Sequence, residues 1–260
     1  MKRRDVLILA GSLPLGVNAQ VSDLADAINK AGRQRMLSQR MGKAWLAMVH
    51  KTEDRSAQAV LDKSMALFDR QLVELKAYAP SPEIRETYTT LEAAWSDYKT
   101  ALVGAAPSKA GSAALLKADA RVLALAHQGT VQYEAAMGQP VGKLVNVAGR
   151  QRMLSQRMAK FYFAAALPVD ASTALAEIGK ARTEFLAAMT TLREAPEATS
   201  RIRDELSLAD GQWFFFDQAL QRVQSGAAAT AKPLSDVFVT SENLLSVMDR
   251  VTNLYANLKS

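Results

Sequence analysis

The chain has 260 residues, of which 49% are hydrophobic and 22% are charged, and its net charge is +6 at pH 7. This excess of Lys and Arg is mild, which argues against a nucleic-acid-binding protein, since such proteins carry a stronger and clustered basic charge. The sequence contains no cysteine, which excludes disulfides, thiolate metal sites, a cysteine nucleophile and a lipoprotein anchor.

Residues 1–19 have the pattern of an export signal. The basic residues at 2–4 precede a short apolar segment, and Val17-Asn18-Ala19 is a small-residue cleavage site. The apolar segment is shorter than the roughly 20 residues that cross a bilayer. We therefore expect cleavage after Ala19, by the twin-arginine or the general secretory route. The mature protein would then be soluble and periplasmic, with no membrane-spanning segment.

The remaining sequence predicts helices almost throughout, because alanine is abundant and apolar residues recur at steps of three and four. Turn signals that contain Pro, Gly and short polar residues interrupt this pattern. The expected helices cover residues 21–51, 54–78, 82–104, 110–137, 140–166, 170–194, 197–225 and 233–258. The predicted fold class is therefore all-α.

One eleven-residue string, AGRQRMLSQRM, occurs twice without change, at 31–41 and at 148–158. The spacing of 117 residues indicates a tandem duplication, and weaker matches such as Trp95 with Trp213 extend it. We expect two four-helix units, 20–138 and 139–260, which is an ordinary size for such bundles. The link at Gly138-Gln139-Pro140 is short, so the fourth helix is expected to run almost straight into the fifth.

The repeated string places small residues beside an arginine on one helix face, because residues three and four apart are neighbours there. If the two copies pack face to face, Arg35 and Arg152 meet, and their repulsion calls for an anion between them. Guanidinium groups bind planar oxoanions in a bidentate way, and Gly32 and Gly149 would let such an ion touch the backbone. The pattern favours a small symmetric anion such as nitrate. The alternative is that the string is only a packing or solvated face.

The sequence indicates no catalytic, metal or cofactor site. It contains no paired Glu-x-x-His motif, no glycine-rich phosphate loop and no G-x-S-x-G elbow. His50 and His127 have no histidine at the matching positions of the other half, so we expect them to be surface or packing residues. Trp95 and the run 213–216 are expected to pack in the core or between helices rather than to form a ligand cage. We therefore do not expect an enzyme.

The longer strings INKAGRQRMLSQRMGKA and VNVAGRQRMLSQRMAKF resemble the signature of the PilJ-type domain, found at the N-terminus of type IV pilus chemotransducers. They are also similar to the P-box of the NarX/NarQ nitrate–nitrite sensor kinases. The resemblance implies four-helix ectodomains that dimerise around one anion, held by the motif glycine and the arginine three residues after it. The implied anion-binding residues are Gly32, Arg35, Gly149 and Arg152, supported by Asn29, Gln39, Arg40, Asn146, Gln156 and Arg157.

This chain differs from the nitrate sensors in two respects. Arg33-Gln34 and Arg150-Gln151 stand where those sensors have Ser-Leu, which is the PilJ-like form, and the sensors' membrane helices and output modules do not occur in the sequence. The resemblance thus implies a periplasmic nitrate- or nitrite-binding protein, equivalent to two linked sensor ectodomains. Its partner would be a membrane sensor, a transporter or a pilus component. The alternative is an envelope or type IV pilus interaction protein without a small-molecule ligand, which should expose an apolar patch.

Overall fold

The computed structural model describes residues 20–167, 171–224 and 231–258, and these residues form eight helices and no strands. The helices are α1 (Leu24–Val49), α2 (Asp54–Tyr78), α3 (Pro82–Val103), α4 (Ser112–Met137), α5 (Pro140–Ala165), α6 (Ala171–Glu194), α7 (Ser200–Gln224) and α8 (Ala231–Ala256). Each expected helix is present within three residues of its predicted ends. The predicted all-α fold with two four-helix units is confirmed. The predicted export signal lies outside the described residues.

Ordinary capping signals set several helix ends. Asp23 accepts a hydrogen bond from the Asp26 amide at the start of α1 (2.8 Å), and Ser81 caps α3 directly before Pro82. Gly138 ends α4 with φ 62°, a left-handed conformation that glycine adopts readily. The chain therefore turns back into α5, and the expectation that α4 runs nearly straight into α5 is wrong.

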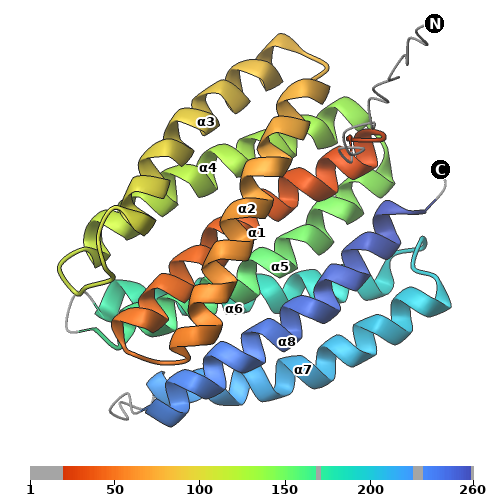
Figure 1. Cartoon of the computed structure of the whole chain (residues 1–260). Coiled ribbons are helices and arrows are strands. Elements are labelled where there is room, and N and C mark those ends of the chain that lie inside the picture. The colour runs from red at the N-terminus through yellow and green to blue at the C-terminus, as the bar shows by residue number, and fades with distance from the viewer. Residues whose placement is uncertain (1–19, 168–170, 225–230, 259–260) are drawn as a thin grey trace, which may run out of the picture.

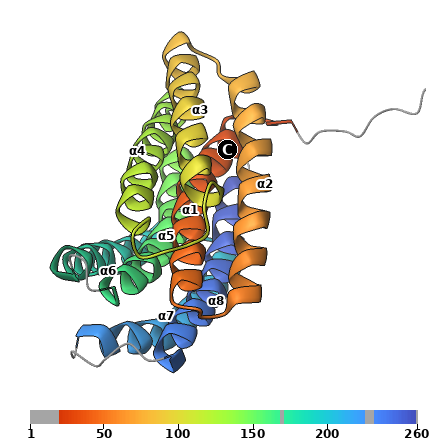
Figure 2. The same ribbon diagram turned by 60° about the vertical axis from the view of Figure 1, so that its left-hand side comes forward.

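The two helices that carry the repeated string, α1 and α5, run side by side through the middle of the molecule (Figure 1). Around α1 lie α2 and α4, with α3 against α4; around α5 lie α6 and α8, with α7 against α8. Additional contacts join α1 to α8 and α4 to α5. Figure 2 shows the two sets of outer helices on opposite sides of this central pair. The units therefore share one core, and α1 and α5 occupy equivalent places in it.

Aromatic contacts repeat between the units and support the duplication. Phe68 packs on Trp95 with 4.2 Å between ring centroids, and Phe185 stacks on Trp213 at 4.5 Å. Both phenylalanines are fully buried, and burying such a side chain stabilises the fold by about 1.5–3 kcal/mol. The hydroxyls of Tyr133 and Tyr255 donate to the carbonyls of Leu75 and Leu192, which are again matching positions.

The aromatic run 213–216 does not pack as expected. Phe216 is buried, but Phe214 and Phe215 are each 60% exposed on α7. Successive helical residues point about 100° apart, so four adjacent aromatic residues cannot all face one core. The expectation of core packing holds for Trp213 and Phe216 and is wrong for the two residues between them.

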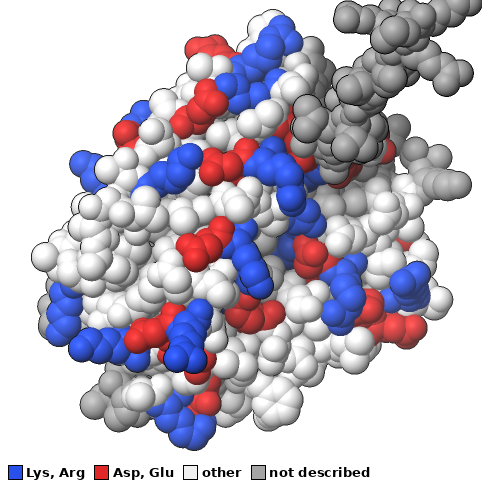
Figure 3. Space-filling model, in the orientation of Figure 1, with Lys and Arg blue, Asp and Glu red and all other residues white. Residues whose placement is uncertain are grey.

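The surface shows no block of one charge on the face drawn in Figure 3, where Lys and Arg lie among Asp and Glu. Within the described ranges, no helix has the length and apolar character that crossing a membrane requires. The same residues contain no group of three His, Asp or Glu side chains that could hold a metal ion.

Candidate functional site

Gly32 of α1 and Gly149 of α5 lie against each other where the two helices pack. A Cβ atom placed on Gly32 would lie 3.8 Å from the Gly149 Cα atom. Glycine at both positions leaves space for the arginine tips that surround this contact. These two residues therefore let the repeated helices approach each other beside the arginine tips.

Arg35 and Arg152 lie at this contact and are both fully buried. The same Cβ position on Gly32 would lie 3.2 Å from Arg35 Nη2 and 3.6 Å from Arg152 Nη2. Each guanidinium reaches across to the opposite helix: Arg35 Nη2 donates to the Asn146 carbonyl (3.3 Å) and Arg152 Nη2 to the Asn29 carbonyl (3.0 Å). The structure thus brings the four predicted residues together, and their role in anion binding stays a prediction.

The two arginines differ in what neutralises them. Arg152 Nη1 donates to the Asp249 carboxylate at 2.6 Å. At the matching place, Arg35 Nη1 contacts His127 Nδ1 at 3.2 Å. Within the described ranges no carboxylate forms an ion pair with Arg35, and the Nε atoms of both arginines have no hydrogen-bond partner there. Arg35 is therefore a buried cation without a counter-charge in contact.

The pKa shifts of Arg35, Asp249 and His127 follow from this difference. Burial, with repulsion from Arg150 and Arg152, lowers the pKa of Arg35 to about 9, which leaves it charged at neutral pH. Burial would raise the pKa of Asp249, but Arg152 and Arg33 outweigh it and lower that pKa to about 2. Burial, Arg35 and Arg150 lower the pKa of His127. Because a guanidinium only donates, the His127 Nδ1 atom must accept, which leaves Nε2 as the ring's donor.

The predicted supporting residues do not all point to one centre. Asn29 and Asn146 contribute carbonyls to the opposite arginine, while their side chains bond Asn253 and Glu134. Gln39 and Gln156 donate further along the helices, to Asp119 (2.8 Å) and to the Ser241 carbonyl (2.9 Å). Arg40 and Arg157 pair at the flanks with Glu242 and Glu177.

Sequence reasoning missed a second, reciprocal pair of buried cations. Lys43 crosses from α1 to Ser241 and Glu242 on α8, and Lys160 crosses from α5 to the buried carboxylate of Asp119 on α4. Burial lowers the pKa of Lys43 to about 8 although Glu242 opposes the effect. The only signal was that Lys follows both copies of the string, since Asp119 and Glu242 have no acidic match in the other half.

The sequence predicted a surface or packing role for His127 and gave no sign of its contact with Arg35, because Asp249 occupies its matching position and the two share no chemistry. In the structure it contacts Arg35 and lines a cavity of about 390 Å³ between α4, α5 and α6. We call this space the α4–α6 cavity, and its lining comprises Arg35, Ala120, Leu123, Ala124, His127, Arg150, Met153, Leu154, Arg157, Glu177, Lys180, Ala181 and Glu184. The open space beside Arg35 therefore lies to one side of the glycine contact.

The model of the family described as the N-terminal domain of type IV pili methyl-accepting chemotaxis transducers, PilJ, matches this chain twice, over residues 17–124 and 135–251. The chain belongs to the PilJ family. The first match ends within α4 and the second runs from the end of α4 into α8, and each contains one copy of the repeated string. No curated protein and no solved structure gave a match.

Proposed function

We propose that this chain is a periplasmic sensory module that binds a small anion at the buried arginines of α1 and α5. Nitrate and nitrite are the first candidates, because the repeated string is similar to the motif of the nitrate–nitrite sensors. Membership of a family of chemotaxis transducer domains supports a sensory role that passes the signal to a membrane sensor, a transporter or a pilus component. No catalytic step forms part of this proposal.

The observation that carries the proposal is the buried, incompletely neutralised pair of Arg35 and Arg152. Removing a guanidinium from water costs several kcal/mol unless a counter-charge compensates. Asp249 supplies one for Arg152, and a bound anion would supply the other for Arg35. An anion at this place would also bias how α1 and α5 pack, and these helices join the two units.

The proposal can be tested by calorimetric titration and thermal shift of the purified protein 20–260. Sodium nitrate, nitrite, sulfate and chloride are compared at constant ionic strength, and a ligand at about 100 times its Kd should add roughly 2.7 kcal/mol of stability. Replacing Arg35 by Met should weaken the binding by about tenfold to a hundredfold, since charge-assisted hydrogen bonds contribute about 1.5–3 kcal/mol each. If neither these inorganic anions nor small organic acids titrated alongside them bind, a sensory site at these arginines is rejected.

A second candidate, an interaction protein of the envelope or of the type IV pilus, is favoured by one observation. Phe214 and Phe215 project side by side from α7, with 5.6 Å between ring centroids, and exposed apolar groups of this kind occur at binding surfaces. In vivo cross-linking from the exposed position Gln218, one turn further along α7, would test it. A Phe214→Ser, Phe215→Ser double variant should then lose the cross-linked partner, whereas a partner that persists unchanged would reject this candidate.

A further inference from the structure

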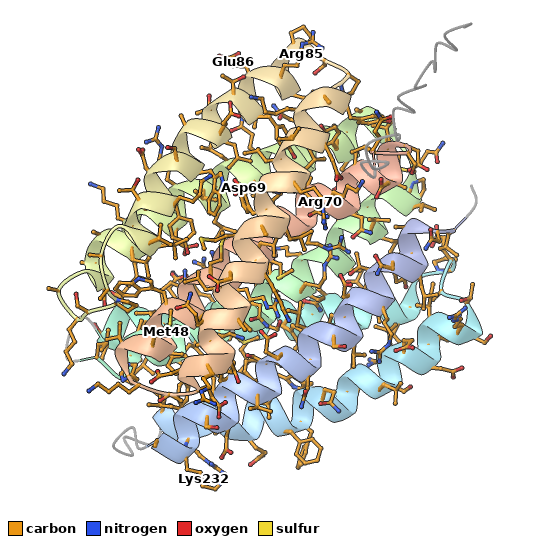
Figure 4. The ribbon with its side chains drawn as sticks, in the orientation of Figure 1. Met48, Asp69, Arg70, Arg85, Glu86 and Lys232 are labelled. Carbon is orange, nitrogen blue, oxygen red and sulfur yellow. The ribbon has the colours of Figure 1, made fainter. Side chains whose placement is uncertain are left out.

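The duplication gives the α4–α6 cavity a counterpart in the other half. A groove of about 430 Å³ lies between α1, α2 and α8, and we call it the α2–α8 groove. Arg70, labelled on α2 in Figure 4, lies on its rim. Matching positions of the repeated string line both spaces, Arg150, Met153 and Arg157 in the cavity and Arg33, Met36 and Arg40 in the groove. The two spaces are therefore the same site in evolutionary origin and can be compared position by position.

The α2–α8 groove contains carboxylates of its own. Asp249 accepts hydrogen bonds from Arg152 Nη1 (2.6 Å) and from Arg33 Nη2 (3.1 Å). Its carboxylate thus links Arg152 of α5 to Arg33 of α1. Glu242 lines one side of the same groove and pairs with Arg40. This half shows where a carboxylate belongs in the site and which nitrogen atoms it contacts.

The α4–α6 cavity lacks both of these carboxylates. The residues at the places of Asp249 and Glu242 are His127 and Ala120, at the same offset of 122 that relates Tyr133 to Tyr255. An uncharged imidazole cannot neutralise Arg35, and an alanine leaves space. Arg150, the counterpart of Arg33, pairs instead with Glu184 on α6, with Nη2–Oε2 at 3.0 Å. The position that a carboxylate fills in the groove is therefore without one in the cavity.

The lining also indicates the kind of molecule that fits. Four cationic side chains (Arg35, Arg150, Arg157 and Lys180) and two carboxylates (Glu177 and Glu184) face the cavity, so its charge favours an anion. Leu123, Met153 and Leu154 supply an apolar wall beside these charges. A cavity of about 390 Å³ has room for a carbon skeleton as well as an acidic group.

We infer that the α4–α6 cavity binds the carboxylate of a small organic acid, which takes the place beside Arg35, Arg150 and His127 that Asp249 fills beside Arg152 and Arg33. The inference rests on the proposed function of an anion-sensing module and names the ligand class and the position. The guanidinium groups and the His127 Nε2 donor bind the carboxylate, and the apolar wall contacts the carbon chain. Asp249 acts as a built-in ligand in the other half, so each chain takes up one molecule.

The test is calorimetric titration of the protein 20–260 with acetate, succinate and L-glutamate, with sodium nitrate alongside at the same ionic strength. We expect at least one of the three acids to bind with a stoichiometry of one. The variant His127→Asp introduces the carboxylate that the other half already has. It should weaken acid binding by about tenfold or more and melt at a higher temperature than the wild type without ligand.

Matched variants at one motif position separate the two halves. Arg150→Gln should weaken acid binding by about tenfold, whereas Arg33→Gln, at the same position in the first copy, should leave the affinity unchanged. Circular dichroism checks that each variant is folded. If His127→Asp does not fold, Arg150→Gln and Arg33→Gln still decide the question.

Each other outcome overturns the inference in a recognisable way. Acid binding that is equal in the wild type, His127→Asp and Arg150→Gln places the ligand elsewhere. Nitrate binding that needs Arg35 and Arg152 equally, without any acid binding, overturns the inference and keeps the proposed function. Binding of neither acids nor inorganic anions overturns both.

Discussion

The two halves of this protein repeat one site with different solutions to the same electrostatic problem. On the α8 side, Asp249 and Glu242 neutralise the buried cations Arg152 and Lys43, which lie in or just after the repeated strings. On the α4 side, Asp119 does so for Lys160, but Arg35 has only His127. The comparison teaches that an identical motif need not make identical sites, because the outer helices decide which cation is left for an external partner.

The largest expected effect concerns the fully buried pair of Lys160 and Asp119. Asp119→Ala leaves the Lys160 ammonium in the core without its partner and takes an acceptor from Gln39. Breaking such a pair costs about 3–5 kcal/mol. Glu242→Ala in the other half should cost less, about 1–3 kcal/mol, because Glu242 is partly exposed and Lys43 keeps Ser241. Urea unfolding at pH 7 measures both, and equal losses would contradict the difference between the halves.

The next prediction compares the two buried arginines. From the sequence alone, removing either is expected to be neutral or stabilising, since each would relieve the same repulsion. In the structure Arg152→Met removes one of the two arginines that pair with Asp249, the other being Arg33. The change should lower the free energy of unfolding by about 1–3 kcal/mol. Arg35→Met removes a cation without an acidic partner and should change the stability little or increase it. Thermal melts without added anion measure the difference, and a larger loss for Arg35→Met would reverse our assignment.

The fold was predictable because its signals are local and repeated. Turn residues such as Pro82 and Gly138 fix where helices end, and an unchanged string of eleven residues marks equivalent helices. The meeting of Arg35 and Arg152 was predictable for the same reason, since two identical faces with small residues favour packing on each other. These inferences needed only the periodicity of one helix and the symmetry of a duplication.

The remainder of the site depends on contacts between distant segments. His127 reaches Arg35 from 92 residues away, and Asp249 reaches Arg152 from 97 residues away. Which helical face points inward at those positions depends on how α4 and α8 rotate against the central pair. The last helices also match at an offset of 122 rather than 117. The residues at the matching positions, Asp249 and His127, differ in chemistry and therefore gave no signal in the sequence. Single-residue differences of this kind become interpretable only once the two sites can be superimposed.

Lowering the pH should remove the contribution of the Asp249 carboxylate to the free energy of unfolding. The folded protein lowers the pKa of Asp249 to about 2 from its ordinary 3.8, where burial opposes and Arg152 and Arg33 outweigh it. Its stabilisation is therefore complete above the unfolded pKa and is lost as the pH falls from about 4 toward 2. We expect roughly 1–2 kcal/mol, since a side chain 37% exposed is partly screened by water.

The measurement is the free energy of unfolding at pH 5, 4, 3 and 2 for the wild type and Asp249→Asn. The advantage of the wild type should shrink across this range. Asp97→Asn, which removes an exposed ion pair with Arg121, serves as the control and should follow the wild type at each pH. A constant difference between the wild type and Asp249→Asn would show that the Asp249 charge is not what stabilises the folded state.

The smallest expected effect concerns three helical glycines. Gly32 and Gly149 lie beside the buried arginines, and Gly211 serves as the comparison. Gly211 on α7 has open space where a Cβ would be, so Gly211→Ala should stabilise by about 0.5–1 kcal/mol, as alanine does in a helix interior. At Gly32 the new Cβ would lie 3.2 Å from Arg35 Nη2, and at Gly149 it would lie 3.2 Å from Arg152 Nη2. The arginine tip must move in both cases, but Arg152 is held by Asp249 and Arg35 is not. Thermal unfolding should therefore rank the variants Gly211→Ala, Gly32→Ala and Gly149→Ala from most to least stable, and identical values at 32 and 149 would mean that the two arginines are held equally.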